Sequence, residues 1–416
     1  MLRTNIIELT PTKQQGKILK EMLVRSSALW NIGNFQKRQA FFKKEHPFPS
    51  YSKQCEGLKT HVLYTSLGSA YSQQILKKLS TSWQSFWNSL TSEKVEHTIS
   101  MPSYFKNYKT KQTLPKLLIC RNDCYRIDTT FIYISCSKDL AKVNKIKGLL
   151  KIRYNGIRKW KGVKKTMEIK YFPFSKKFYA YQTEEVPSTP IETEQQNICS
   201  IDLGIKRYIT AYIKNSNDFC LLYESNHIFK KYLRISKRIA YYQAIAKKEN
   251  NSYSSHRIRR LYLKRKRQLM NYLNNILAHL FRKLQTYKIS TIVLGELKGI
   301  RNSHIPPHYR NKKKIHKMIQ NFWSYNLFLK KLQNTCEELG ITLIPVNEAY
   351  TSSTCPICKN PVEANDRKFQ CPHCGYTQDR DVVGCINILG DYIHDYDIDD
   401  IRVENYPVVS TIVIES

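Results

Sequence analysis

The sequence predicts an α/β protein made of several modules, and three observations lead to this class. Short segments rich in β-branched residues, typical of buried strands, alternate with long segments of helical periodicity. A chain of 416 residues with 41% hydrophobic residues can form about two to four domains and bury a substantial core. Two Cys-x-x-Cys pairs near the C-terminus indicate a small metal-binding module.

The charge of the chain indicates a polyanionic partner. Lys and Arg number 68 against 33 Asp and Glu, a net charge of +35. Nucleic acid is the first candidate, because neutralising phosphates releases counterions; the alternative is a solvated basic surface. The chain has no run of about 18 apolar residues, and Met1–Asn5 lacks the apolar core of a secretory signal. We therefore expect a cytoplasmic protein.

The first half of the chain divides into a helical and a β-rich module. Residues 1–12 contain a strand at 3–9, and 13–99 have helical spacing, beginning with Gln15, Ile18, Leu19 and Met22. Aromatic residues in this stretch are predicted to pack in the core rather than to stack on bases: Trp30, Phe35, Phe41, Phe42, Trp83 and Phe86. Residues 100–190 are β-rich. Their interleaved cationic and aromatic residues fit two interpretations equally well: contacts to nucleic acid, and ordinary solvent-facing strand positions.

The second half follows a polar, proline-containing linker at 186–196. The expected order is strand, strand, strand, helix, strand, helix, strand, then the cysteine module and a last helix, an order that suits a ribonuclease-H-like mixed sheet. The expected strands are 197–203, 208–213, 219–223, 289–295 and 341–346, and the helical segments are 228–285, 318–339 and 379–391.

Positive charge is concentrated on the helical segment 228–285 and on a loop at 300–317. Candidate contacts to the nucleic-acid backbone are Arg257, Arg259, Arg260, Lys264, Arg265, Lys266, Arg267, Lys312, Lys313 and Lys314. Leucines and isoleucines from Leu261 to Leu280 form the apolar stripe of this helix. Residues 391–416 form an acidic C-terminal tail that carries −6, so residues 1–390 alone carry +41. The sequence does not show what this tail does.

Four cysteines have the spacing of a metal site. Cys355, Cys358, Cys371 and Cys374 form two short turns, each of which can present two thiolates to one ion. Four cysteine ligands leave no open position, so we predict a structural zinc ion, with iron as the less favoured alternative. His373 lies inside the second turn and is not expected to be a ligand. The other eight cysteines are scattered, which is typical of a reducing compartment.

Three acidic residues are candidates for a second metal site. Asp202 and Glu296 end apolar strands, and Asp381 opens the last helix. Acids at the carboxyl ends of neighbouring strands can converge on one edge of a sheet and bind two Mg²⁺ ions, which prefer anionic oxygen. Asp-x-Gly after a strand is also a common turn, and chemistry alone does not separate Asp379 from Asp381.

At this point the motifs resemble the transposon-encoded TnpB (OrfB) proteins, relatives of compact type V CRISPR nucleases. The resemblance covers about residues 197–390 and rests on Ser200–Ile205, Gly295-Glu296, Tyr350–Cys358, Cys371–Tyr376 and Asp379-Arg380-Asp381. It implies a RuvC nuclease whose catalytic acids are Asp202, Glu296 and Asp381, the last chosen because the second Asp of this motif is the family's metal ligand. The family's Asn-Ala-Ala is replaced here by Val383-Gly384-Cys385, which bears on whether cleavage is retained.

The resemblance also implies a prokaryotic, nucleoid-associated protein, and it implies partners and roles for the modules. Residues 1–12 and 100–190 would form an oligonucleotide-binding-like wedge domain, and 13–99 a recognition domain. Residues 197–349 and 377–390 would form the RuvC domain, and 350–376 a zinc ribbon. The implied partners are a guide RNA and a double-stranded DNA target beside a short flanking motif, bound by a monomer, with Mg²⁺ and Zn²⁺ as cofactors. The alternatives are a guide-dependent DNA-binding protein without cleavage and a transposase or accessory transposition protein. The sequence does not distinguish a transposon from a CRISPR context.

Overall fold

A computed structural model describes residues 1–91, 99–187, 197–204, 207–214, 218–296, 324–363, 367–395 and 407–414. The chain divides into two compact units, Met1–Pro187 (unit 1) and Ser188–Ser416 (unit 2), with the division inside the predicted linker. Each unit contains a sheet and helices, so the predicted α/β class is confirmed. Across the described parts of the chain, no helix combines the length and the apolarity needed to span a membrane.

The sheet of unit 1 has seven strands in the order β2-β6-β7-β1-β5-β4-β3, and all neighbours are antiparallel. The strands are β1 (Leu2–Leu9), β2 (Leu118–Cys120), β3 (Tyr125–Ile127), β4 (Phe131–Ile134), β5 (Leu150–Asn155), β6 (Val163–Phe172) and β7 (Lys177–Glu185). Strands β3 and β4 form a hairpin, because the Asp128 carboxylate accepts hydrogen bonds from the backbone of Thr130 and Phe131 and closes a turn.

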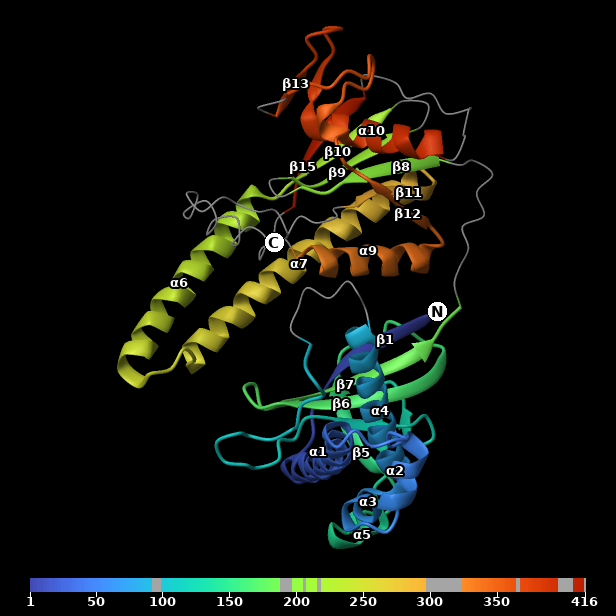
Figure 1. Ribbon diagram of the computed structural model, residues 1–416, viewed down its shortest axis with the longest axis vertical. Coiled ribbons are helices and arrows are strands. Elements are labelled where there is room, and N and C mark those ends of the chain that lie inside the picture. Colours follow the sequence, from blue (N-terminus) through green and yellow to red (C-terminus); the bar gives the residue numbers. More distant parts are fainter. Residues whose placement is uncertain are drawn as a thin grey trace. The chain divides into compact units, whose positions relative to one another are not determined.

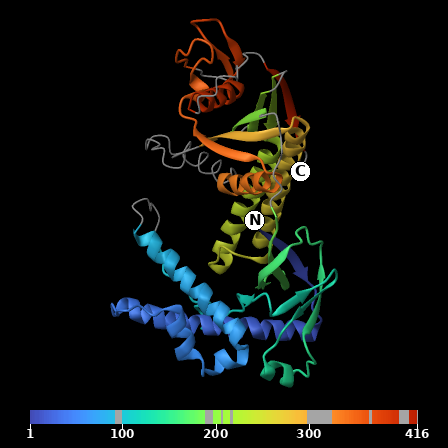
Figure 2. The same ribbon diagram turned by 90° about the vertical axis from the view of Figure 1, so that its right-hand side faces the viewer.

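Five helices of unit 1 complete its core. They are α1 (Lys13–Phe42), α2 (Tyr51–Leu58), α3 (Val62–Leu67), α4 (Ser69–Thr91) and α5 (Lys138–Val143). Thr12 and Gln15 form a capping box that begins α1 at the predicted residue. Helices α1 and α4 pack against one another (Figure 2) and share an apolar core with the sheet.

The aromatic residues of these helices divide into two groups. Trp30, Trp83 and Phe86 are buried and Phe41 packs against them, as predicted. Phe35 and Phe42 are 54% and 64% exposed, so the core prediction is wrong for these two. Helical spacing indicates which residues share a face, but the width of the buried stripe depends on the neighbouring helices.

The sheet of unit 2 has six strands in the order β12-β11-β8-β9-β10-β15. They are β8 (Asn197–Asp202), β9 (Arg207–Lys214), β10 (Phe219–Glu224), β11 (Ile289–Glu296), β12 (Thr342–Asn347) and β15 (Val408–Val413). Strands β8, β9 and β10 are antiparallel neighbours, whereas β11 and β12 run parallel to β8. Five of these strands lie where the sequence predicts them.

The sixth strand, β15, corrects the interpretation of residues 391–416 as a tail. Residues 408–413 pair in parallel with β10, and the preceding helix extends to Asp395 rather than 390. The net charge of this segment did not indicate a strand, because six of its seven acidic residues precede the β-branched sequence Val-Val-Ser-Thr-Ile-Val.

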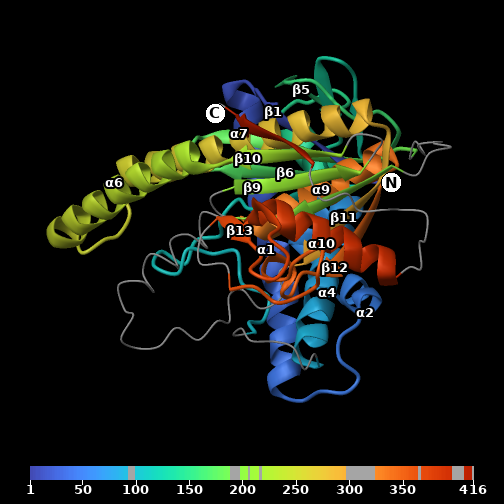
Figure 3. The ribbon, with the colours of Figure 1, turned by 90° about the horizontal axis from the view of Figure 1, so that it is seen from above.

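Helices cover both faces of this sheet (Figure 1). They are α6 (Asn226–Asn250), α7 (His256–Thr286), α9 (Tyr325–Leu339) and α10 (Arg380–Asp395). Helices α7 and α9 pack on one face of the sheet and α10 packs on the other. Each face has its own apolar core. The predicted helical segment 228–285 is a pair of helices, because Asn251 adopts a left-handed conformation that ends α6 and Ser255 caps the start of α7. The pair extends away from the sheet (Figure 3).

Candidate functional site

Strands β8 and β11 carry two of the candidate acids to one edge of the unit 2 sheet. The strands are parallel neighbours, with Ile201 paired to Leu294. Asp202 is the last residue of β8 and Glu296 the last residue of β11. The structure therefore brings both residues to the same edge.

The two acids belong to opposite faces of the sheet. Ser200 donates a hydrogen bond of 2.7 Å to the Cys385 carbonyl of α10, so Asp202, two residues later, shares the α10 face. A side chain at Gly295 would place its Cβ 2.8 Å from Ile388 Cδ1 of α10. Residue 295 therefore faces α10, and strand alternation directs Glu296 toward the other face.

Glu348, directly after β12, fills the space above Gly295. Its Oε2 would lie 2.7 Å from a Cβ at position 295, so the carboxylate occupies the volume that glycine leaves open. This oxygen is buried and has no hydrogen-bond partner among the residues that the structure describes. Glu348 is not among the acids predicted from the sequence, although it lies two residues after the predicted strand 341–346.

The electrostatics of Asp202 link Glu348 and Asp381 to one site. Burial and the negative charge of Asp381 raise the pKa of Asp202 to about 7. Burial and the negative charge of Asp202 raise the pKa of Glu348 to about 8. Asp202 therefore interacts with two other acids. Two cations offset part of this negative charge, since Arg380 acts to lower the pKa of Asp202 and Arg207 contacts Asp381.

Glu348→Gln should stabilise the metal-free protein above neutral pH. The folded pKa of Glu348 exceeds its unfolded value, so its favourable contribution is present at acidic pH and is lost as the pH rises through about 8. Glutamine removes this loss, and we expect about 2 kcal/mol of stabilisation at pH 8.5, after solvent screening, and none at pH 4.5. Thermal unfolding in a chelator at both pH values measures the effect. The exposed Glu363→Gln is the control, and equal shifts of both variants at the two pH values would contradict the assignment.

Asp379 and Asp381 have different surroundings. Asp379 Oδ1 accepts a hydrogen bond of 2.5 Å from Arg207 and one of 3.0 Å from the backbone N–H of Asp381, at the start of α10. Asp381 also contacts Arg207, at 3.0 Å, and its charge acts on Asp202. The geometry thus distinguishes two residues that chemistry alone leaves equivalent. Asp379 accepts a hydrogen bond from the first turn of α10, whereas Asp381 interacts with Asp202.

The unusual tripeptide Val383-Gly384-Cys385 fits three different environments. Val383 is buried against the cysteine module, and the Cys385 thiol lies 3.2 Å from the Thr210 carbonyl of β9. A Cβ at Gly384 would lie 3.1 Å from Asp202 Oδ2, a tight contact that glycine avoids. The departure from Asn-Ala-Ala therefore leaves α10 packed on the sheet and Asp202 unobstructed.

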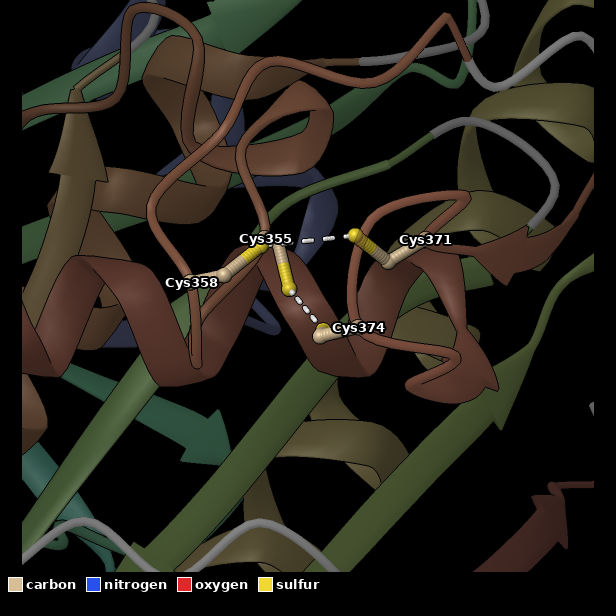
Figure 4. Close-up of side chains that lie close together, drawn as sticks. All are labelled: Cys355, Cys358, Cys371 and Cys374. Carbon is tan, nitrogen blue, oxygen red and sulfur yellow. Dashed lines mark hydrogen bonds between the residues drawn. The ribbon is translucent and has the colours of Figure 1, made fainter.

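Cys355, Cys358, Cys371 and Cys374 gather their sulfur atoms from two loops (Figure 4). All four Sγ atoms lie within 4.8 Å of one another, and no other set of three or more potential ligands in the described ranges is this compact. A tetrahedral ion with ligands at about 2.3 Å requires sulfur separations of roughly this size. His373 is exposed and is not a member of the cluster. The cluster predicted from sequence spacing is therefore present.

The two cysteine loops have matching backbone turns. In each, the residue four positions after the first cysteine donates to the carbonyl of that cysteine: Lys359 to Cys355 and Gly375 to Cys371, both at 3.0 Å. Both donors have positive φ, of 58° and 74°. The backbone N–H of Asn360 lowers the pKa of Cys358 and favours its thiolate. Strands β13 (Lys368–Gln370) and β14 (Thr377–Asp379) and the short helix η2 (Thr351–Ser353) complete this module.

The cationic residues predicted on α7 form an exposed surface with one exception. Arg265 is half-buried, where its guanidinium lies 4.7 Å from the Tyr232 ring and donates to Ser236 at 2.8 Å. The remaining six are exposed: Arg257, Arg259, Arg260, Lys264, Lys266 and Arg267. Leu263, assigned to the apolar stripe, is 39% exposed and does not belong to it. Lys312, Lys313 and Lys314 lie outside the described residues.

Comparison with known proteins gives matches over most of the chain. Residues 179–301 match the family described as "Probable transposase" (OrfB_IS605), and residues 325–388 match the Cas12f1-like TNB domain. TnpB-like protein ORF457 of Acidianus two-tailed virus is 27% identical over 93% of this chain and 86% of its own length. TnpB-like protein L79 of Acanthamoeba polyphaga mimivirus is 24% identical over 55% of this chain and 43% of its own length.

Compact CRISPR nucleases also match. Cas12f1 of Syntrophomonas palmitatica is 32% identical over 81 residues, which are 18% of this chain and 16% of its own length. The solved structure of the mini-RNA-guided endonuclease CRISPR-Cas_phi3 aligns over 94% of this chain and 92% of its own, with 12% identity and a TM-score of 0.47. The sequence matches confirm the resemblance that the motifs indicate: this chain is related to the TnpB (OrfB) proteins and to the compact Cas12 nucleases.

Proposed function

We propose that the protein is an RNA-guided DNA endonuclease that hydrolyses phosphodiester bonds at the acidic edge of the unit 2 sheet. The observation that carries this proposal is the group of Asp202, Glu348 and Asp381. Asp202 and Glu348 face α10, the helix that carries Asp381, and a buried Glu348 oxygen lacks a hydrogen-bond partner within the described residues. A buried carboxylate oxygen without a donor, near another acid, is the environment that a cation stabilises.

The strand order supports a RuvC domain of the ribonuclease-H-like type. Three antiparallel strands, β8, β9 and β10, are followed in sequence by β11 and β12, which lie parallel to β8 on its other side. In this arrangement the first and fourth strands are neighbours, so their carboxyl ends meet. Unit 1 would then supply the recognition (13–99) and wedge (1–12 and 100–190) domains.

Mg²⁺ is the cofactor that suits these ligands. The donors are hard carboxylate oxygens. Burial, together with the charge of a neighbouring carboxylate, raises the pKa of both Asp202 and Glu348, and a divalent cation would relieve both effects. When bound, the ions would activate water and stabilise the leaving oxygen. In this proposal Asp202, Glu348 and Asp381 hold the ions and orient the scissile phosphate. Glu348 thus takes the role that the sequence predicts for Glu296.

Zinc is the cofactor that suits the cysteine cluster. Four mutually close sulfur atoms form a closed ligand set, and the cluster packs against Val383 of α10. A structural ion there would fix the module that precedes Asp381, so zinc would support the site without taking part in the chemistry.

The guide RNA and the target DNA are the proposed partners. The net charge of +35 and the six exposed cations of α7 suit contacts to phosphates, while base pairing with the guide would read the sequence. These six cations lie on a helix pair that projects from the sheet (Figure 3).

Sequencing the RNA that copurifies with the protein, followed by cleavage of a matching target in Mg²⁺, tests the proposal. We expect one RNA species to be enriched and the target to be cut by the wild type but not by Asp202→Asn. Guide-dependent target binding without cleavage in Mg²⁺ or Mn²⁺ would instead support a DNA-binding protein. Strand transfer of DNA ends without a guide would support a transposase.

A further inference from the structure

Arg207, the first residue of β9, connects three acidic residues from different elements of unit 2. Its Nη1 lies 2.5 Å from Asp379 Oδ1 and 3.0 Å from Asp381 Oδ2, and its Nε lies 3.1 Å from Glu224 Oε1 at the end of β10. The Arg207 side chain is only 13% exposed. A planar guanidinium can make these contacts together because its donors point in fixed, divergent directions.

The contacts of Arg207 engage one oxygen of Asp381. In the described part of the chain, Asp381 Oδ2 accepts from Arg207 and lies 3.7 Å from Arg367 Nη1, and no hydrogen bond goes to Oδ1. Asp379 is occupied differently, since its Oδ1 receives both Arg207 and the backbone N–H at the start of α10. Asp379 Oδ1 is therefore shared between Arg207 and the start of α10, while Asp381 uses only Oδ2 for Arg207.

Arg207 also connects the acidic site with the cysteine module. Asp379 is the last residue of β14, which pairs with β13 in that module, and Glu224 belongs to the central sheet. The guanidinium thus fixes the start of α10 relative to both the sheet and the module. A charge-assisted contact to a partly buried carboxylate is strong and directional.

We propose that Arg207 is a positioning residue for divalent-cation binding: it holds Asp381 by Oδ2, so that Oδ1 is presented to a cation shared with Asp202. The proposal rests on the proposed function for its catalytic consequence, but cation binding can be measured without a nucleic acid. Outer-shell contacts of this kind alter metal affinity by about 10–100-fold in other proteins.

Titration of the full-length protein with Mn²⁺, followed by electron paramagnetic resonance, tests the role of Arg207. We expect Arg207→Gln and Arg207→Lys each to weaken Mn²⁺ binding by at least about 10-fold. Lysine should fail because a single ammonium group cannot hold Glu224, Asp379 and Asp381 in the fork geometry. Lys214→Met is the matched control: it breaks the ion pair with Asp218 at the other end of β9, 3.2 Å long, and should leave Mn²⁺ affinity within about twofold.

Two Mn²⁺-binding results would overturn the proposal. Wild-type or tighter Mn²⁺ binding by Arg207→Gln would show that Arg207 only competes with the cation. Wild-type binding by Arg207→Lys would show that charge, and not geometry, matters. Cleavage assays separate this inference from the proposed function. If Mn²⁺ binding depends on Arg207 but the protein never cleaves DNA, only the proposed nuclease function is rejected. If both Arg207 variants cleave with wild-type Mn²⁺ dependence, only the positioning role is rejected.

Discussion

Glu348→Gln should lower the rate of target cleavage by roughly 1,000-fold, whereas Glu296→Gln should change it by less than about threefold. A metal-held carboxylate contributes several kcal/mol to a phosphoryl-transfer transition state, and each 1.36 kcal/mol corresponds to a factor of ten in rate. Glu348 lies beside Asp202 in the space above Gly295, while strand alternation directs Glu296 away from α10. The sequence alone predicts the opposite result.

Single-turnover cleavage at saturating guide RNA and Mg²⁺ measures this difference. Both variants exchange a carboxylate for an amide of the same shape, so they are matched in chemistry and size. Guide-RNA affinity, measured in parallel, should be unchanged in both. A large loss for Glu296→Gln together with an active Glu348→Gln would restore the assignment of Glu296 and reject that of Glu348.

Cys371→Ser should remove the proposed zinc ion and unfold the cysteine module. A structural zinc ion contributes about 10–16 kcal/mol to the folding of isolated zinc-finger peptides, far more than the small apolar core of this module can provide. That core consists of the buried residues Val362, Phe369 and Tyr376, together with Val383 of α10 and the cysteines themselves. Asn387 of α10 donates hydrogen bonds to the carbonyls of Thr351 and Thr354, at 2.7 and 2.8 Å. Loss of the ion should therefore loosen α10 and abolish cleavage.

Zinc stoichiometry and amide hydrogen exchange test this expectation. We expect one zinc ion per chain in the wild type, none in Cys371→Ser, and fast exchange at Phe369 and Tyr376, with Ile209 of β9 still protected. His373→Ala is the matched control, because His373 is exposed within the same loop and outside the cluster. Full zinc content in Cys371→Ser, or zinc loss in His373→Ala, would contradict the four-cysteine assignment.

Much of the fold follows from local sequence signals. Strands β8 to β11 are largely apolar segments with mostly buried residues, and such segments mark buried strands wherever they occur in a chain. Thr12 and Gln15 satisfy the first amide groups of α1 by themselves, so this helix start is visible before any packing is known. The cysteine cluster is equally local, because one short loop supplies each pair of ligands.

Long-range pairing accounts for the elements that the sequence did not predict. Strand β15 exists because β10 offers an open edge about 190 residues earlier in the chain, which a count of local charge does not detect. Strand β6 of unit 1 is a similar case: four of its ten residues are charged, yet it pairs with β2 on one side and β7 on the other. Context of this kind overrides intrinsic strand propensity.

By itself, the sequence determined the α/β class, the zinc-type cysteine set, the relationship to TnpB proteins and the presence of acids at the ends of strands. Only the tertiary structure decided which acids share a site. Strand alternation places Glu296 and Gly295 on opposite faces, and Glu348 enters the volume that Gly295 leaves empty. The tertiary structure likewise distinguished Asp381 from Asp379 through the contacts of Arg207, a residue more than 170 positions away. The physical reason is that a carboxylate's role depends on neighbours brought together by folding, whereas its place at the end of a strand is already present in the local sequence.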